Sequence, residues 1–355
     1  MLGKTRPDDK LSMKKDLIKT SIFRLITYLI FPLFLSTTAA EIVLRVAGYK
    51  PWEIENANVA VEPKGNFFTK DAELGYKHLP GNFKVTLNGN YSFNATHLKN
   101  TLRITHPLNT YNSQSTKPEL WIFGCSFTYG WSLNDEATYP WLLQEKLPQY
   151  EIVNFGVNGY GTIHSYIQFQ EALKQRNKPH IAVIAYAGFH DRRNTFSRAR
   201  RKQMAAWNKL GFLLQPDAKL NKQKGFTYSM TPLKYRELPL MRVSALINFL
   251  DNNYNQFEEG YYRSHEVSKA IIKQFNYLAE ANGVKLVVAG INPGSAKMLE
   301  ELSGEGIETV DISVDLKIRA NNNLPHDLHP SPIANWQYAQ KLESFLQKSN
   351  EYSYD

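Results

Sequence analysis

Three short segments of the chain hold residue types that acyl-transfer chemistry requires. The first, GCSFTYG at residues 124–130, places Ser126 on a glycine-flanked turn after an apolar run. A serine on a tight turn between a strand and a helix exposes its hydroxyl, and a flanking backbone N–H can stabilise an oxyanion. Ser126 is therefore a candidate nucleophile. The alternative is a serine that only caps the following helix.

The second segment, NFGVNGYGT at residues 154–162, contains Gly156, Gly159 and Gly161. Glycines allow the backbone to approach a ligand closely and present an N–H group to it. A dinucleotide-binding loop has the spacing G-x-G-x-x-G, whereas the spacing here is G-x-x-G-x-G. Nucleotide binding is therefore disfavoured. An oxyanion-binding turn and a glycine-rich connection without function both remain open.

The third segment, HDLHPS at residues 326–331, places Asp327 two residues before His329. An aspartate can orient an imidazole and stabilise its charged form, while the histidine accepts a serine proton. One alternative is a polar surface loop. Another is a metal site formed by His326, Asp327 and His329, although the sequence offers no further cluster of ligands for it.

Together and in this order, the three segments resemble the SGNH/GDSL hydrolase family of esterases and acyltransferases. The similarity covers residues 118–191 and 265–346. The resemblance implies that Ser126 is the nucleophile and that Asp327 and His329 form the acid–base pair. It also implies an oxyanion hole built from the N–H groups of Ser126 and Gly159, with no cofactor and no metal.

Two positions depart from the family's pattern. Cys125 replaces the aspartate that usually precedes the serine, and we expect it to pack beside the nucleophile; a thiol nucleophile is the alternative. Residues 188–191 read GFHD where the family has Gly-x-Asn-Asp. Because an imidazole N–H donates a hydrogen bond as an amide does, we expect His190 to complete the oxyanion hole. A turn cap, a pair with Asp191 and loss of catalysis are the other interpretations.

The elements that must position these residues form an alternating pattern after residue 118. Apolar runs lie at residues 120–124, 151–156, 180–186, 284–290 and 308–312, and helical patterns at 139–147, 163–175, 265–282 and 334–346. Short apolar strands that alternate with helices predict a parallel sheet covered on both faces. The family resemblance implies about five strands in a three-layer α/β/α sandwich of the flavodoxin-like type. Loops at the carboxyl ends of such strands meet in one crevice.

Two segments lie outside this alternation. Residues 49–117 are rich in Asn, Gly, Thr and Lys and predict a small β-rich lead-in or linker. Residues 192–250 separate the third strand from the fourth, contain no convincing strand and predict a helix at 240–250. The expected organisation is thus an N-terminal tail and anchor at 1–48, the lead-in, and a hydrolase-like domain at 118–350 that carries the insertion.

The net charge of +9 is concentrated in two places. Residues 190–240 hold 12 Lys or Arg and three acidic residues, and the first 24 residues hold seven basic and three acidic residues. Because the excess is local, a nucleic-acid partner is not supported. The basic insertion is either a solvated surface or a rim for an acidic polymer or lipid headgroups. The single cysteine excludes an intrachain disulfide and a multi-cysteine metal site.

The N-terminal region predicts export. Residues 25–40 carry no charge, and basic residues from Lys4 to Arg24 precede them. This asymmetry places the tail in the cytoplasm and the rest of the chain across the membrane. With its neighbours, the apolar stretch is long enough for an uncleaved anchor. A signal peptide cleaved after Ala40 is the alternative, and a buried helix of a soluble protein is a third.

The combined expectation is a membrane-anchored serine esterase or acyltransferase that faces the periplasm or the cell exterior. Its DxH segment and its anchor are similar to family members that move acetyl groups on cell-envelope polysaccharides, so the expected substrate is an acyl ester or an O-acetylated glycan. Hydrolysis and transfer use the same residues, and both remain open. An alternative from another class is a non-catalytic envelope scaffold or glycan-binding protein. The sequence indicates neither protein partners nor an oligomeric state.

Overall fold

The computed structural model describes residues 18–351 except 22, 55–57, 111–115, 206–210, 212 and 224. The tail residues from Lys4 to Lys15 lie outside the described residues. The chain divides into two compact units. The smaller combines Met1–Ile54 with Arg236–Asn255, and the larger combines Glu55–Tyr235 with Gln256–Asp355.

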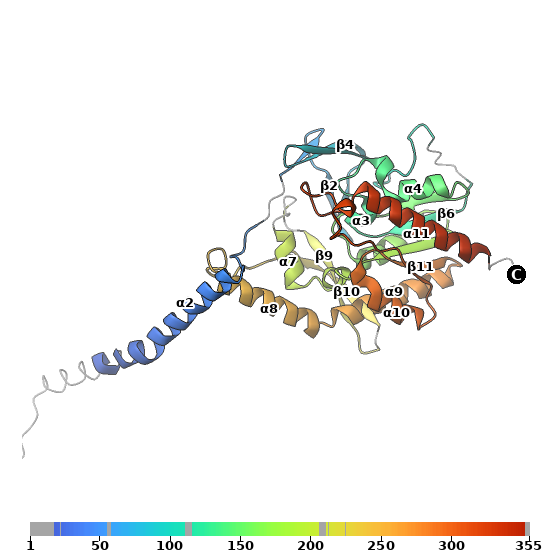
Figure 1. Cartoon of the computed structure of the whole chain (residues 1–355). Helices are drawn as coiled ribbons and strands as arrows, with labels where there is room; N and C mark the ends of the chain where they lie inside the picture. The colour runs from blue at the N-terminus through green and yellow to red at the C-terminus, as the bar shows by residue number, and fades with distance from the viewer. Residues whose placement is uncertain are drawn as a thin grey trace, which may run out of the picture. The chain divides into compact units, whose positions relative to one another are not determined.

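A five-stranded parallel sheet forms the centre of the larger unit (Figure 1). Its order is β12-β11-β8-β6-β7. The strands are β6 (Glu119–Phe123), β7 (Glu151–Asn154), β8 (Ile181–Tyr186), β11 (Lys285–Gly290) and β12 (Thr309–Asp311). Every residue of β8 is buried, as expected for a parallel strand covered on both faces. The predicted three-layer sandwich is confirmed.

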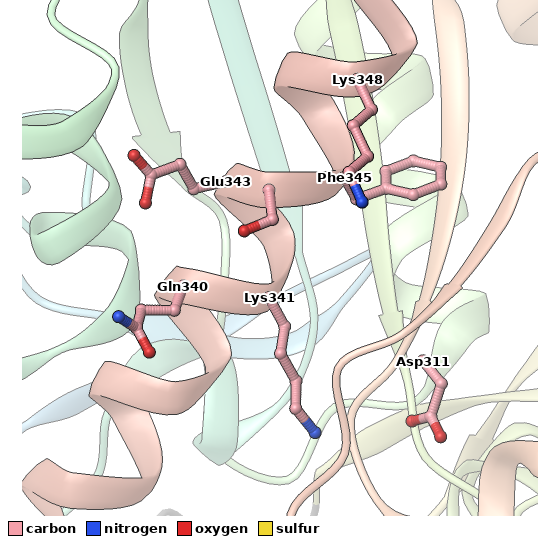
Figure 2. Close-up of a pocket in the computed structure, with 7 residues that line it drawn as sticks. Asp311, Gln340, Lys341, Glu343, Phe345 and Lys348 are labelled. Carbon is pink, nitrogen blue, oxygen red and sulfur yellow. The ribbon is translucent and has the colours of Figure 1, made fainter.

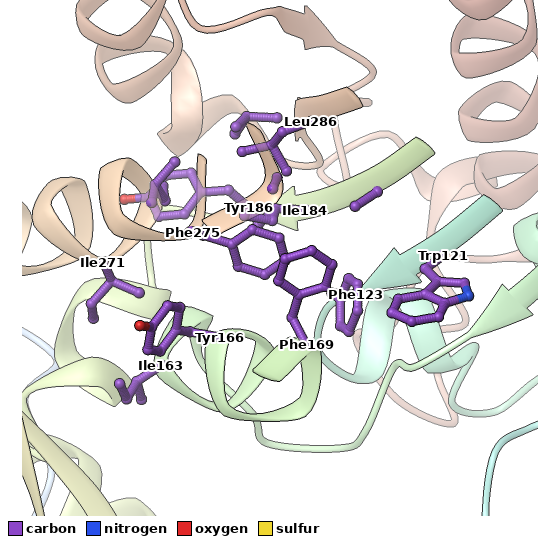
Figure 3. Close-up of a cluster of buried hydrophobic side chains, with 14 of the residues drawn as sticks. Trp121, Phe123, Ile163, Tyr166, Phe169, Ile184, Tyr186, Ile271, Phe275 and Leu286 are labelled. Carbon is purple, nitrogen blue, oxygen red and sulfur yellow. The ribbon is translucent and has the colours of Figure 1, made fainter. Parts of the chain in front are cut away.

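Two helical layers cover this sheet because alternate side chains of each strand point to opposite faces. The helices are α4 (Tyr139–Lys146) and α11 (Pro332–Glu351) on one face, and α5 (Thr162–Gln175), α9 (Ser264–Ala281) and α10 (Ala296–Ser303) on the other. Leu120 and Ile122 of β6 pack with the first pair of helices. Phe123 packs with the second group, in which the rings of Phe169 and Phe275 stack 4.2 Å apart (Figure 3).

The β-rich lead-in is also confirmed, and it packs against the core. An antiparallel sheet contains β1 (Val59–Glu62), β4 (Gly81–Leu87) and β5 (Tyr91–His97), and β2 (Phe68–Asp71) pairs with β3 (Gly75–His78). Alternate residues of β4 and β5 are buried, so the sheet has one apolar face. That face packs against Tyr129, three residues after Ser126. The segment is therefore an integral layer and not a linker.

A buried arginine in the segment between β5 and β6 forms hydrogen bonds to the core. Arg103 is 1% exposed, and its Nε donates to Asp135 Oδ1 at 2.8 Å. Its Nη atoms donate to the carbonyl oxygens of Tyr129, Gly130 and Leu133 at 2.6–2.8 Å. A buried charge is tolerated where such bonds satisfy it. Arg103 thereby fixes the turn that follows the candidate nucleophile.

The expectation of no strand in the insertion is wrong. β9 (Leu214–Leu220) and β10 (Phe226–Pro232) form an antiparallel hairpin. The side chain of Asn221 closes its turn by accepting the N–H groups of Gln223 and Gly225. Ala218, Leu220 and Phe226 pack against the core, but the strands also contain Gln215, Asp217 and Lys219, so they do not read as an apolar alternation. The short helices α6 (His190–Asn194) and α7 (Arg198–Ala205) precede the hairpin.

The predicted helix at 240–250 is correct in type and wrong in its bounds. Helix α8 spans Ala245–Tyr261. Leu240 has a φ of +65°, which is incompatible with a right-handed helix. The helix therefore starts only after this residue, and it continues well beyond the predicted end.

The smaller unit contains the N-terminal helix, whose last regular part is α2 (Phe31–Val46). Within the described part of the chain, one helix, Ile18–Val46, is long and apolar enough to cross a membrane. None of its most apolar stretch is buried, and a signal sequence would share these properties. This finding is compatible with the predicted anchor and with the predicted signal peptide.

Candidate active site

Ser126 lies at the point where the strand order of the sheet reverses. The chain passes from β6 to β7 on one side and then to β8 on the other side of β6. The crevice beyond the carboxyl ends of such strands is the usual ligand site of open α/β sheets. Ser126 begins the short helix α3 (Ser126–Tyr129), three residues after β6 ends. Gly124 is required at this turn, because a Cβ there would lie 2.1 Å from Thr128 Oγ1.

The structure brings Ser126, His329 and Asp327 together. The Oγ atom of Ser126 lies 3.0 Å from Nε2 of His329. On the other side of the ring, His329 Nδ1 lies 3.3 Å from Asp327 Oδ2. The backbone N–H of His329 also donates to Asp327 Oδ1 at 3.0 Å. A hydroxyl, an imidazole and a carboxylate are thus arranged in the sequence that nucleophilic catalysis by serine needs.

The environment of Asp327 favours its ionised form. Burial by itself raises the pKa of a carboxyl group, but the hydrogen bond and charge of His329 and the hydroxyl of Ser132 lower it more. The net result is a pKa of Asp327 below its usual value. An ionised Asp327 can hold the imidazole in the tautomer that leaves Nε2 free to accept the serine proton.

Sequence reasoning missed Ser132, which supports this carboxylate. Its Oγ lies 3.0 Å from Asp327 Oδ1 and 2.7 Å from the carbonyl oxygen of Trp131, so its one proton can serve either acceptor. Asn323 Nδ2 donates to the same Oγ at 2.8 Å. Ser132 has a φ of +62°, a strained conformation for a residue with a side chain. No sequence pattern marks it, because the contact joins residues far apart in the chain.

Removing the Ser132 hydroxyl is expected to reduce kcat/KM by about 3- to 10-fold, the range for one lost hydrogen bond. The pKa of Asp327 should also rise in Ser132→Ala, because the hydroxyl is one of the groups that lower it. Ser132→Gly is the matched variant, because it lacks the hydroxyl but relieves the positive φ. Equal losses in both variants assign the effect to the hydroxyl. An unchanged kcat/KM in both variants would contradict a positioning role.

Three side-chain hydrogen-bond donors hold the loop that carries Gly159. Tyr76 Oη donates to the carbonyl oxygen of Asn158 at 2.6 Å, and Arg200 Nη2 donates to that of Gly159 at 2.6 Å. Arg193 Nη1 donates to the carbonyl oxygen of Tyr160 at 2.8 Å. Three successive peptide planes are therefore fixed, as a preorganised anion-binding turn requires.

Only glycine fits at position 159. Its φ is +82°, and a Cβ would lie 2.5 Å from Tyr76 Oη and 2.7 Å from Arg200 Nη2.

Arg193 and Arg200 belong to the basic insertion, which the sequence analysis interpreted either as a solvated surface or as a ligand-binding rim. Arg200 is only 2% exposed, so neither interpretation describes it. Burial, followed by the charge of neighbouring Arg193, lowers the pKa of Arg200 to about 9.

His190 follows β8 and is 1% exposed. Its Nδ1 accepts the backbone N–H of Ala187 at 3.4 Å, which leaves the ring proton on Nε2. Burial, followed by the charge of Arg193, holds the pKa of His190 well below its usual value. The ring is therefore neutral at neutral pH. Its Nε2 has no hydrogen-bond partner among the described residues, and a buried donor of this kind needs an acceptor.

The other predicted residues have clear positions. Asp191 does not pair with His190: its carboxylate accepts from Tyr186 Oη at 2.6 Å and lies 3.2 Å from His265 Nδ1. Cys125 is fully buried beside Ser126, as expected. The ring of His326 stacks on Tyr91 with 4.3 Å between centroids. Among the described residues, no cluster of His, Cys, Asp or Glu could hold a metal ion, so the metal interpretation gains no support.

A surface pocket of about 530 Å³ lies elsewhere, between α11 and β12 (Figure 2). Lys341, Phe345 and Lys348 of α11 line it together with Asp311 of β12. It contains none of the predicted site residues. Ser126, His329 and Asp327 therefore do not line this pocket.

No family model and no curated protein matches the chain. Solved structures that match include a member of the lipolytic G-D-S-L family from Veillonella parvula DSM 2008, with 11% identity and a TM-score of 0.37. The match spans 98% of that protein's chain and 64% of this one. The psychrotrophic esterase EstA from Pseudoalteromonas sp. has 12% identity and a TM-score of 0.36, with 100% of its chain and 66% of this one covered. A GDSL-like lipase from Bacteroides thetaiotaomicron VPI-5482 has 13% identity and a TM-score of 0.35, with coverages of 93% and 70%.

Proposed function

We propose that this chain is a serine esterase or acyltransferase of the SGNH/GDSL type. The observation that carries the proposal is the 3.0 Å separation of Ser126 Oγ and His329 Nε2, with Asp327 on the other side of the imidazole. This geometry supports the transfer of the serine proton to the histidine during nucleophilic attack. The buried N–H of His190 and the fixed Gly159 turn support an oxyanion hole at the same sheet edge.

In the proposed reaction, Ser126 Oγ bonds to the acyl carbonyl carbon while its proton passes to His329 Nε2. The carbonyl electron pair moves to oxygen, where N–H groups of Ser126, Gly159 and His190 stabilise the charge. Collapse of this intermediate breaks the ester bond, and His329 gives the proton to the leaving alkoxide. Water or a sugar hydroxyl, deprotonated by His329, then attacks the acyl carbon, the bond to Ser126 Oγ breaks, and His329 returns the proton to Ser126 Oγ.

The substrate that we propose is an acyl ester, of acetate in particular, on a cell-envelope carbohydrate. The proposed location is outside the cytoplasm, with Ile18–Val46 as a membrane anchor. The basic residues that precede this helix and its apolar length support that location. A reporter fused after Asp355 should be active only outside the cytoplasm. The mass of the mature N-terminus separates the alternatives, because a chain that starts at Glu41 indicates a cleaved signal.

Covalent labelling tests the catalytic proposal. A fluorophosphonate should label the detergent-solubilised full chain, and Ser126→Ala should abolish the label. A small acyl ester should be turned over by the same preparation, and product analysis with added glycans separates hydrolysis from transfer. The absence of both labelling and turnover in folded protein would instead favour a non-catalytic glycan-binding or scaffold protein. The histidine at position 190, where the family has asparagine, is the feature that favours this second candidate.

A further inference from the structure

Within the smaller unit, the N-terminal helix holds the start of α8. The carboxylate of Glu41 accepts the backbone N–H groups of Ala245 and Leu246 at 2.9 and 2.8 Å, and the hydroxyl of Ser244 at 2.8 Å. A carboxylate in this position satisfies free N–H groups and complements the helix dipole. The first turn of α8 is therefore fixed at the level of Glu41 on the N-terminal helix.

Glu41 lies near the C-terminal end of the candidate membrane span. Glu41 precedes Val46, the last residue of the helix, by five residues, which is about 7–8 Å along a helix axis. Nearby contacts lie at the same end: Arg45 Nη2 donates to the carbonyl oxygen of Val243 at 2.7 Å. The rings of Tyr49 and Phe249 meet edge to face at 5.1 Å. If the helix spans a membrane, α8 begins at the membrane–water interface.

In the part of α8 that belongs to the smaller unit, large apolar side chains are exposed and polar ones are buried. Leu250 and Tyr254 are 51% and 54% exposed, and their spacing of four residues places them on one side of the helix. We call these two residues the α8 stripe. Asp251 and Asn255, on another side, are 1% and 5% exposed. The turn before the helix adds two exposed apolar residues, Leu240 at 69% and Val243 at 64%.

We propose that the α8 stripe rests in the headgroup region of the leaflet in which the N-terminal helix ends. This inference rests on the proposed membrane anchor. The occupant is lipid, because Glu41 and Arg45 join the start of α8 to the end of the span, and the exposed apolar side chains of Leu240, Val243 and the α8 stripe lie next to that end. Tyrosine is enriched at this depth, where its ring is buried and its hydroxyl remains hydrated.

The chain allows this to be tested with site-specific probes. Its single cysteine, Cys125, is fully buried, so a cysteine introduced on the surface can be labelled selectively in the full-length protein. An environment-sensitive fluorophore is attached at Leu250→Cys or at Tyr254→Cys. Asn252→Cys is the matched control, because it is also exposed and lies about 200° around the helix from position 250. Leu33→Cys, within the apolar helix, reports on the anchor itself.

The labelled chains are reconstituted into phosphatidylcholine–phosphatidylglycerol vesicles that contain spin-labelled lipids. We expect strong quenching at position 33, and quenching at 250 and 254 that is roughly two-fold or more above that at 252, since interfacial helices bury their apolar face about 5–10 Å deep. Shallow spin labels should quench positions 250 and 254 better than deep ones. Turnover of a soluble ester by each variant shows that it is folded.

The outcomes separate the two proposals. Quenching at 33 with equal, weak quenching at 250, 252 and 254 would overturn the interfacial role of α8 and leave the anchor intact. Absence of quenching at 33 would overturn the anchor, and the inference about α8 with it. Probes at 250 and 254 that are shielded from aqueous quenchers in detergent but insensitive to spin-labelled lipid would identify a protein contact, and the lipid assignment would be wrong.

Discussion

A Ser126→Ala variant is expected to turn over esters at least about 10⁴-fold more slowly than the parent chain, and His329→Ala should lose a similar factor. The two side chains form one nucleophilic unit, because the hydroxyl is reactive only while the imidazole 3.0 Å away accepts its proton. The double variant should therefore be no slower than either single variant. Steady-state rates with a small acyl ester provide the measurement.

Two further variants sharpen this prediction. Asp327→Asn should cost less than loss of the nucleophile but still a large factor, because the imidazole loses the anion that orients it and stabilises its charged form. Cys125→Ser should retain most of the activity, since the thiol is fully buried. Near-normal turnover by Ser126→Ala, or loss of activity in Cys125→Ser alone, would show that the nucleophile has been assigned wrongly.

The second large effect is expected at His190. If its Nε2–H holds the oxyanion, His190→Ala should lower kcat by about 10²–10³-fold, the loss measured for one oxyanion donor. His190→Asn should recover a good part of this loss, because an amide restores a donor. KM should change little in either variant, because the hydrogen bond strengthens only in the transition state.

The electrostatics of His190 give this prediction a second readout. Burial and the charge of Arg193 hold the pKa of His190 well below its usual value, so its imidazole should stay a neutral donor around neutral pH. Replacing it should therefore scale the pH–rate profile without changing its shape. Equal activities of the alanine and asparagine variants would remove His190 from the oxyanion hole and leave it as the acceptor that caps the Ala187 turn.

The sheet, its helices and the meeting of Ser126 with His329 could be predicted from the sequence for a physical reason. Buried parallel strands read as continuous apolar runs, and their carboxyl ends share one edge, so motifs that follow separate strands must converge. The assignment of roles used the family resemblance in addition. Geometry alone can place a serine beside a histidine without excluding a structural role.

The supporting residues could not be predicted in this way. Ser132 acts through a carboxylate 195 residues away, and Arg200 through the carbonyl oxygen of a glycine 41 residues away. Such contacts depend on tertiary packing and produce no periodic pattern in the sequence.

The basic insertion could not be interpreted correctly for a related reason. A cluster of charged residues suggests a solvent-exposed surface, whereas Arg193 and Arg200 donate hydrogen bonds to backbone carbonyl oxygens. The hairpin of β9 and β10 could not be predicted because polar residues and prolines interrupt its strands, so the few apolar residues that pack against the core form no regular pattern.

The contacts of Arg103 limit how this protein can be divided. Its guanidinium comes from the segment before the hydrolase-like domain, yet it holds the carbonyl oxygens of Tyr129, Gly130 and Leu133, directly downstream of Ser126. A chain that began at residue 118 would contain Ser126, Asp327 and His329 but would leave these oxygens and Asp135 without the Arg103 donor. The lead-in segment is thus part of the structure that holds the turn after Ser126. Recombination that replaced it would have to supply a buried cation at the same point.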